Sequence, residues 1–286
     1  MFTSIHFFFC CFLFASYDIR ATEPLLKNIH NSPDNWLRPV TPFKMADHTW
    51  YIGTEGLSAL LIKTNAGAIL IDGGVPYSAK MLINNMKKLG VSPKDLKWIV
   101  FTHGHYDHAG SLAEIKSLTG ALVASNNESA ALAGRGGKND IHFGDKYPFK
   151  AFKTDRYLMD GEVIELGGIS LKAHFTPGHT PGSLSWTWTD QREGKNIQIA
   201  YVDSLSAPGY KLVNNSRYPN IVEDFKKGIA KVRSLPCDLL MTPHPEASGW
   251  TPMNTAIPLA KPMTCKSFAD KVELKIDEQI KAEKKK

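Results

Sequence analysis

Hydrophobic and polar positions alternate along the first half of the chain with the two periods that belong to strands and to helices. Short segments that are either alternating or continuously apolar, bounded by glycine-containing turns, predict strands at residues 48–53, 58–63, 68–72, 97–102 and 121–124. Longer segments with a period near 3.6 predict helices at residues 77–89, 109–119 and 128–133. Alternation of strands with helices is typical of an α/β fold.

The second half of the chain is richer in strands. The same patterns predict strands at residues 163–166, 169–175, 183–189, 197–202 and 237–241, and helices at 221–234 and 267–281. Two β-rich halves that are each covered by helices bury their sheets most simply by packing them face to face. We therefore expect one domain over residues 22–286, with strand ends meeting at one edge.

The N-terminus carries a separate apolar segment. Residues 5–15 are mostly apolar but too few to span a bilayer of about 30 Å as a helix, and they have the length of the core of a signal peptide. We expect residues 1–21 to direct export and to be removed, although no lysine or arginine precedes the segment. A membrane anchor and a wrongly assigned start codon are the alternatives.

Composition excludes some classes of protein. A chain of 286 residues with 43% hydrophobic and 22% charged residues builds an ordinary globular core and is not disordered or fibrous. The net charge of +6 comes from 34 lysines and arginines that are spread along the chain. Without a basic, aromatic-rich stripe, nucleic acid is not an expected partner, and the charge favours anionic small molecules at most.

Four cysteines remain to be placed, and Cys10 and Cys11 lie inside the expected signal peptide. Export to an oxidising compartment would let the other two, Cys237 and Cys265, form a disulfide. Such a bond would tie the segment at 237–241 to the start of the last helix. Two buried free thiols are the alternative.

The chemistry of the chain is concentrated in the segment His103-Gly-His-Tyr-Asp-His108, directly after a predicted buried strand. Three imidazoles and a carboxylate at this spacing suit zinc, and the carboxylate among them can hold a second ion. His179 and His244 each follow another apolar segment. Ligands of α/β folds gather at strand ends, so we favour a metal site over isolated core histidines or a solvated histidine-rich loop.

Six ligands fit two ions with three protein ligands each, which leaves positions open for water and substrate, as in catalytic zinc sites. A structural zinc site fills all four positions with protein ligands and usually includes cysteine, which this cluster lacks. The pattern therefore favours an enzyme over a zinc-binding module without activity.

Taken in order, these motifs resemble the metallo-β-lactamase superfamily, and within it the third subclass of zinc β-lactamases. The similar stretches, besides the histidine motifs and residues 71–74, are 46–50, 142–145, 159–163, 180–183, 203–210 and 235–237. The resemblance implies a four-layer αββα sandwich and a periplasmic enzyme that hydrolyses the amide bond of β-lactam antibiotics. Because it extends to a secreted tetrameric member, it also implies a possible homotetramer, with no stable membrane association after the signal is removed.

The resemblance assigns roles to the ligands. The first zinc ion would be held by His103, His105 and His179. The second would be held by Asp107, His108 and His244. A hydroxide that bridges the two ions would attack the lactam carbonyl, and Asp107 would also orient this hydroxide.

Five further residues match positions with a role in the family. Ser204 and Ser206 match contacts to the carboxylate of penicillins, cephalosporins or carbapenems, and Phe143 and Tyr147 match residues that line the substrate groove. Asp72 matches an acid behind the ligands, which would orient a ligand histidine through its other ring nitrogen.

A rival function comes from the same superfamily. Thioesterases and lactonases with two zinc ions share the histidine motif, and in them an aspartate at a strand end bridges both metals. Asp203 stands in a similar sequence context. We favour the β-lactamase because the similarity continues to Tyr210 and because an exported enzyme is removed from cytosolic glutathione thioesters.

Overall fold

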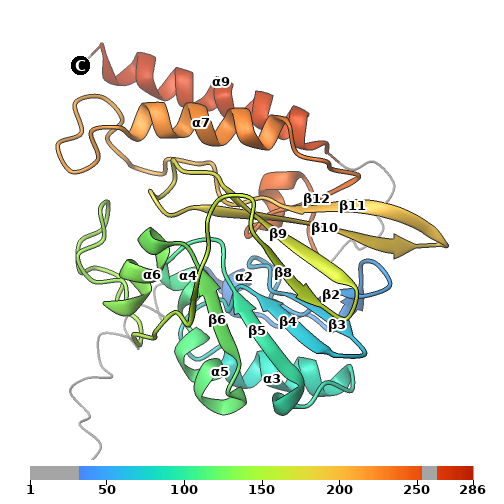
Figure 1. Cartoon of the computed structure of the whole chain (residues 1–286). Coiled ribbons are helices and arrows are strands. Elements are labelled where there is room, and N and C mark those ends of the chain that lie inside the picture. Colours follow the sequence, from blue (N-terminus) through green and yellow to red (C-terminus); the bar gives the residue numbers. More distant parts are fainter. Residues whose placement is uncertain (1–31, 253–262, 286) are drawn as a thin grey trace, which may run out of the picture.

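The computed structural model describes residues 32–252 and 263–285. Figure 1 shows two β-sheets packed against each other, with helices covering the outer side of each sheet. The arrangement is the expected αββα sandwich, so the predicted fold class is confirmed.

The first sheet contains seven strands in the order of the chain, from β1 to β7. Its strands are β1 (Phe43–Lys44), β2 (Thr49–Tyr51), β3 (Leu60–Thr64), β4 (Gly67–Ile71), β5 (Leu96–Val100), β6 (Leu122–Ser125) and β7 (Arg156–Tyr157). Strands β1 to β4 are antiparallel, whereas β4 to β7 run parallel. Parallel neighbours need crossover connections, and helices α3 (Ala79–Lys88) and α5 (Leu112–Thr119) lie in two of them.

The second sheet contains five strands in the order β12-β11-β10-β9-β8. They are β8 (Val163–Leu166), β9 (Ile169–Phe175), β10 (Leu184–Arg192), β11 (Lys195–Tyr201) and β12 (Leu239–Met241). Only the pair of β11 and β12 is parallel, and helix α7 (Ile221–Arg233) lies in the connection between them. Figure 1 shows α7 beside the last helix, α9 (Cys265–Glu283), on the outer side of this sheet.

Three separate hydrophobic clusters hold the four layers together. Strand β4 contributes side chains to two of these clusters. Ile69 and Ile71 point into the core between the sheets, while Ala68 and Leu70 point toward α3 and α5. The third cluster lies between the second sheet and α7 and α9. Burying a large aliphatic side chain stabilises the fold by about 1.5–3 kcal/mol. A strand with both faces buried therefore needs apolar residues at consecutive positions.

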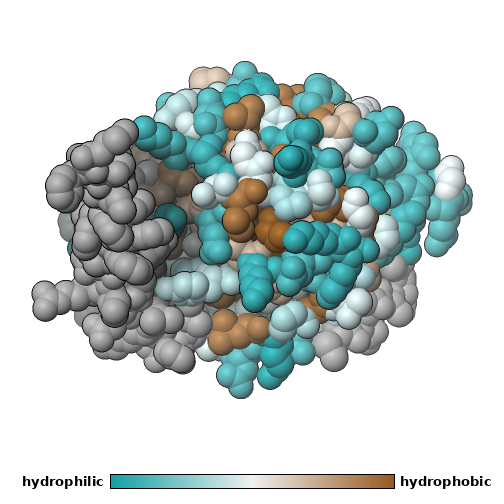
Figure 2. Space-filling view, turned by 90° about the horizontal axis from the view of Figure 1, so that it is seen from below, coloured by the Kyte–Doolittle hydropathy of each residue, from teal (hydrophilic) through white to brown (hydrophobic). Residues whose placement is uncertain are grey.

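Helix α3 is amphipathic and buries the side chains of Leu82, Ile83 and Met86, and Met86 follows the other two by four and three positions. Figure 2 looks at the molecule from the side of α3 and α5, where the surface is largely hydrophilic with scattered hydrophobic residues. The pattern that predicted this helix thus reflects its position between core and solvent.

The helix predicted at residues 109–119 is interrupted, and that boundary was wrong. The chain forms a short helix α4 (Tyr106–Ala109) and then α5. The backbone N–H of Gly110 donates a hydrogen bond to the carbonyl of Gly74, and the Ser111 hydroxyl donates one to the carbonyl of Gly73. These bonds to the loop after β4 compete with the continuous helix.

Several short elements had not been predicted. They are β1, β7, α2 (Asp34–Leu37), and the 3₁₀ turns η2 (Pro93–Asp95) and η3 (Pro245–Ser248). Segments this short show no measurable hydrophobic period. The helix predicted at 128–133 is confirmed as α6 (Asn127–Gly134). The predicted signal peptide, residues 1–21, lies outside the described residues. Among the helices of residues 32–252 and 263–285, none is both long and apolar enough to cross a membrane.

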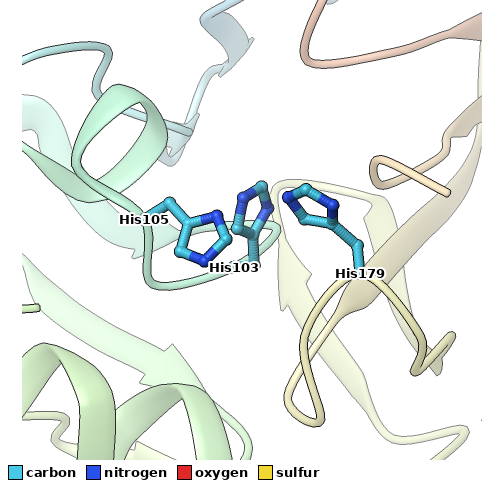
Figure 3. A group of neighbouring side chains, drawn as sticks. All are labelled: His103, His105 and His179. Carbon is cyan, nitrogen blue, oxygen red and sulfur yellow. The ribbon is translucent and has the colours of Figure 1, made fainter. Parts of the chain in front are cut away.

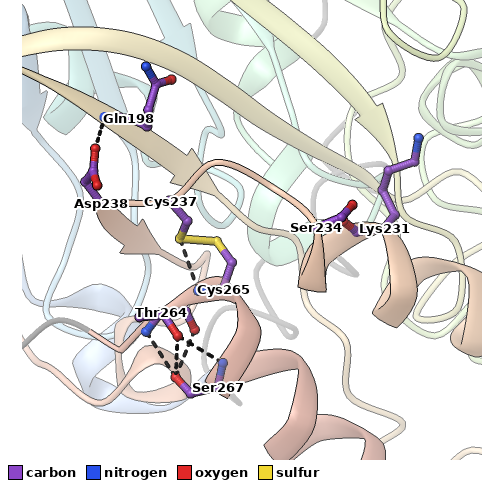
Figure 4. Close-up of a disulfide and its surroundings, with 8 residues drawn as sticks. All are labelled: Gln198, Lys231, Ser234, Cys237, Asp238, Thr264, Cys265 and Ser267. Carbon is purple, nitrogen blue, oxygen red and sulfur yellow. Dashed lines mark hydrogen bonds between the residues drawn. A yellow bond between two sulfur atoms is a disulfide. The ribbon is translucent and has the colours of Figure 1, made fainter.

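A disulfide joins Cys237 to Cys265, as expected from the sequence. Figure 4 shows that it connects the segment before β12 to the first residue of α9. The Cα atoms are 5.9 Å apart, and 28 positions separate the two cysteines. Cross-linking a loop of this length restricts the unfolded chain and stabilises the fold by roughly 3–4 kcal/mol in the chain-entropy model.

Replacing both cysteines with serine should therefore lower the free energy of unfolding by roughly 3 kcal/mol, measured by urea denaturation of the mature protein. Wild-type protein unfolded with and without reductant is the control, since its reduced form should match the variant. Equal stability of the oxidised and reduced wild type would contradict the stabilising role of this bond.

Candidate metal centre

All six proposed ligands lie where strands end. His103 and His105 stand in the loop after β5, and Asp107 and His108 follow on α4. His179 lies in the loop between β9 and β10, and His244 follows β12. The two sheets thus bring both groups of loops to one edge of the sandwich.

His103, His105 and His179 form a compact group. A potential ligand nitrogen of each residue lies within 4.8 Å of the others. The ring centroids are 4.5 to 5.0 Å apart, and the three side chains are buried. Figure 3 shows the three rings turned toward one another from loops on opposite sides. This arrangement offers three nitrogen ligands to one cation.

A second group lies next to the first and shares one residue with it. Ligand atoms of His103, Asp107 and His108 also lie within 4.8 Å of one another. Asp107 Oδ2 is 3.2 Å from Nε2 of His108 and 3.4 Å from Nε2 of His244. Asp107, His108 and His244 are therefore brought together around one carboxylate oxygen, although His244 is outside the tighter group that includes His103.

Hydrogen bonds fix the orientation of two of these rings. His103 Nδ1 lies 2.8 Å from Asp203 Oδ1, and His179 Nδ1 lies 2.7 Å from the carbonyl oxygen of Ser206. Since both partners are acceptors, each ring donates its Nδ1–H and keeps a lone pair on Nε2. The Nε2 atom of His103 is buried and has no hydrogen-bond partner in the described part of the chain.

The protonation states fit a cation. Burial holds the pKa of His103 and of His179 well below the ordinary value, so both rings are neutral near pH 7. Burial also lowers the pKa of His108, but the carboxylates of Asp107, Asp72 and Asp203 together outweigh this effect and raise that pKa to about 9. A cation that binds there takes the place of a proton, as metal binding to protonated ligands requires.

Asp72 lies behind the ligand loop, where the sequence placed it, but it is not hydrogen-bonded to a ligand. Its carboxylate accepts hydrogen bonds from the backbone N–H and hydroxyl of Thr102 and from the hydroxyl of Tyr201. The distance from its Oδ2 to His108 Nδ1 is 3.8 Å, beyond hydrogen-bonding range. Asp72 therefore fixes the start of the loop and leaves the orientation of the rings to other groups.

Asp203 is the carboxylate that contacts a ligand directly. It bonds to the Nδ1 atom of His103, whereas the lone pair of this ring is on Nε2. Neither group of potential ligands found among the described residues includes Asp203. The carboxylate thus stands behind the ring, in the position of a group that orients a metal ligand.

Asp140 is a second such carboxylate, and the sequence analysis missed it. Its Oδ2 atom lies 3.2 Å from His105 Nε2, and its Oδ1 atom accepts hydrogen bonds from the backbone N–H groups of His142 and Phe143. An aspartate followed by such a turn is a recognisable local pattern, but its contact with His105 depends on the tertiary fold.

A cleft of about 870 Å³ opens over the two groups of ligands. All four residues predicted to bind substrate line it: Phe143, Tyr147, Ser204 and Ser206. Ser204 is buried, whereas Ser206 is exposed. The serines come from the loop after β11, and Phe143 packs edge-on against Tyr210 at the end of this loop.

Aromatic rings form one wall of this cleft. Tyr106 and Tyr147 are stacked with ring centroids 4.9 Å apart, and Phe143 packs edge-on against Tyr147. Trp36 extends the wall, with its ring 6.2 Å from Tyr106 and 5.3 Å from His244. Trp36 was not predicted as a site residue, because a lone tryptophan in a four-residue helix has no pattern that points to a cleft.

Comparison with known proteins agrees with this geometry. Residues 52–192 match the model of the metallo-β-lactamase superfamily. A mutant of a metallo-β-lactamase with an HARLDQ motif from Cronobacter sakazakii is 34% identical, with a TM-score of 0.83 over 89% of this chain and 100% of that one. The chain belongs to the metallo-β-lactamase superfamily. BJP-1, a subclass B3 enzyme of this superfamily from Bradyrhizobium japonicum, is 33% identical, with a TM-score of 0.80 over 87% of this chain and 97% of its own.

Some curated relatives are enzymes that are named for a different activity. A hydroxyacylglutathione hydrolase from Anaeromyxobacter dehalogenans is 31% identical over 128 residues, which are 45% of this chain and 40% of that protein. The chain spans between 40% and 65% of the length of the first three curated relatives. The superfamily and a metal-dependent hydrolase site are therefore common to both sets of relatives.

Replacing Asp203 with asparagine should weaken metal binding by about 10- to 100-fold, because His103 loses the charged partner that orients it. Metal affinity would be measured by competition with a chromophoric chelator, and the fold by circular dichroism. Asp190→Asn is the matched control. Asp190 is also buried and also bonds to a histidine, His48. It lies near the end of β10, whereas the proposed ligand His179 precedes the start of that strand. Equal affinities of wild type and Asp203→Asn would contradict this role.

Proposed function

We propose that this protein is a zinc-dependent β-lactamase that hydrolyses the amide bond of penicillins, cephalosporins or carbapenems and so confers antibiotic resistance. The position of Asp203 carries this proposal. Thioesterases and lactonases of the superfamily use an aspartate to bridge two metals, whereas Asp203 is bonded to the far side of a ligand ring. The subclass B3 neighbour, which this chain covers almost completely, supports the same conclusion.

Two zinc ions per subunit fit the donors that converge here. His103, His105 and His179 would hold one ion, and Asp107, His108 and His244 the other. The buried Nε2 atom of His103, which has no hydrogen-bond partner in the described residues, supports a cation at this site. When bound, such ions supply hydroxide at neutral pH and polarise a carbonyl group. The remaining steps depend on what the chain itself contributes around them.

The residues around the metal centre would bind and orient the substrate. Ser204 and Ser206 can donate hydrogen bonds to the carboxylate next to the lactam ring, while Phe143 and Tyr147 pack against its apolar substituents. Asp107 would accept a hydrogen bond from the attacking water through its Oδ1 atom, since Oδ2 faces His108 and His244.

The proposal includes export. The apolar residues 5–15 and the disulfide between Cys237 and Cys265 both fit an oxidising compartment, for which the periplasm is the natural choice for a β-lactamase. After removal of the signal, the mature protein would act without a membrane partner. A homotetramer is proposed on the family resemblance alone.

A thioesterase or lactonase is the second candidate, and the similarity to hydroxyacylglutathione hydrolases supports it. Purified, zinc-loaded mature protein should hydrolyse a carbapenem faster than an acyl-homoserine lactone or a glutathione thioester, measured by absorbance. Faster turnover of the lactone or the thioester would replace the proposed function with this candidate.

Chelation should abolish hydrolysis of the carbapenem, and about two equivalents of zinc per subunit should restore it, because the proposed ligands can serve two ions. Metal content would be measured by atomic emission beside the rate. Full activity of protein shown to be metal-free would refute the metal-dependent mechanism.

His179 and Ser206 should differ in kinetic effect although they contact each other through a hydrogen bond. His179→Ala should lower kcat by at least about 100-fold, since it removes a metal ligand, while Ser206→Ala should mainly raise KM, by about tenfold, through loss of a hydrogen bond to a charged group. The backbone carbonyl that orients His179 remains in Ser206→Ala. Equal losses of kcat in the two variants would contradict the substrate-binding role of the serine.

A further inference from the structure

One face of α9 forms part of the cleft over the metal centre. The α9 residues that line the cleft recur every three or four positions: Phe268, Lys271, Val272, Lys275, Ile276 and Gln279. The apolar members of this set are buried against the second sheet and its loops. The two lysines are exposed along the edge of the same face, where it borders the cleft.

Lys271 and Lys275 have no carboxylate partner in the described residues. No ion pair within 4.0 Å includes either amine, whereas Arg233 pairs with Asp270 and Glu273 of the same helix. Two like charges four positions apart destabilise a helix, so helix stability does not explain this arrangement. Glu246 also lines the cleft and offsets one of the two positive charges.

The serine loop places these lysines on the substrate side of the cleft. Leu205 and Ala207 are buried in the same cluster as residues of α9, while Ser204 and Ser206, at alternate positions, line the cleft. Gln279, one turn beyond Lys275, donates a hydrogen bond to the carbonyl of Tyr210 at the end of this loop. The two serines proposed to bind the ring carboxylate and the two lysines of α9 therefore line the same cleft.

We propose that Lys271 and Lys275 form an anion subsite at the α9 end of the cleft, which favours β-lactams carrying a second acidic group beyond the ring carboxylate. This inference rests on the proposed function. It concerns selectivity among substrates, because neither amine belongs to the groups that hold the metals. Attraction between exposed charges is modest and is weakened by salt, so the expected effect is a change in KM that decreases as ionic strength rises.

Two cephalosporins with the same acyl side chain provide the test. Ceftriaxone carries an acidic heterocycle on the 3-substituent, whereas cefotaxime carries a neutral acetoxymethyl group there. Lys271→Gln/Lys275→Gln should raise KM for ceftriaxone by about five- to tenfold, leave KM for cefotaxime within about twofold, and leave kcat unchanged for both. The selectivity should disappear at high salt in the wild type.

Lys266→Gln/Lys281→Gln is the matched control, because it removes the same charge from exposed positions of α9 that do not line the cleft. It should leave both KM values unchanged. Equal changes for the two cephalosporins, or the same change in the control variant, would overturn the subsite while leaving the β-lactamase function intact. Failure of the wild type to hydrolyse either compound would overturn the proposed function and the subsite with it.

Discussion

The hydrogen bond between His103 and Asp203 joins the two sheets at the point where the chemistry is placed. His103 follows β5 of the first sheet and Asp203 follows β11 of the second, and both side chains are fully buried. The same edge is fastened by the backbone bond from Leu184 to Thr102 and by the bond from Tyr201 to Asp72. A buried acceptor left without its donor is costly, so these bonds fix how the sheets meet. The positions of the proposed ligands are therefore fixed by the way the two sheets meet.

Loops that hold ligands in fixed positions must be anchored to rigid layers in both sheets. The core between the sheets and the two cores under the helices each bury large aliphatic or aromatic side chains, and loops anchored to such layers have few ways to move. The cleft can then combine three different surfaces around one reacting bond. Its lining includes imidazoles of the metal centre, the stacked rings of Tyr106 and Tyr147, and residues of the serine loop and α9.

The sequence predicted most of the strands and helices because the buried sides of an element determine the spacing of its hydrophobic residues. The apolar run in β4 and the spacing of Leu82, Ile83 and Met86 both follow from the layers on either side of them. It predicted that these histidines and carboxylates would converge because each follows the end of a predicted strand, and strand ends of α/β folds meet at one edge. The break at Gly110 and the contact of Asp140 with His105 are tertiary interactions, and no local pattern contains them. For Asp203 the sequence left open whether the carboxylate contacts a metal, and its bond to Nδ1 of His103 is a further tertiary contact that no local pattern contains.

Asp140 contacts both a proposed metal ligand and the turn that carries a groove residue. One of its oxygens faces His105, and the other holds the turn that carries Phe143 into the groove. Coupling between two binding equilibria is reciprocal, so a substrate that ordered this turn and a cation held at His105 would each favour binding of the other by the same factor. In that case the proposed enzyme would hold its cation more tightly in the presence of substrate than in its absence.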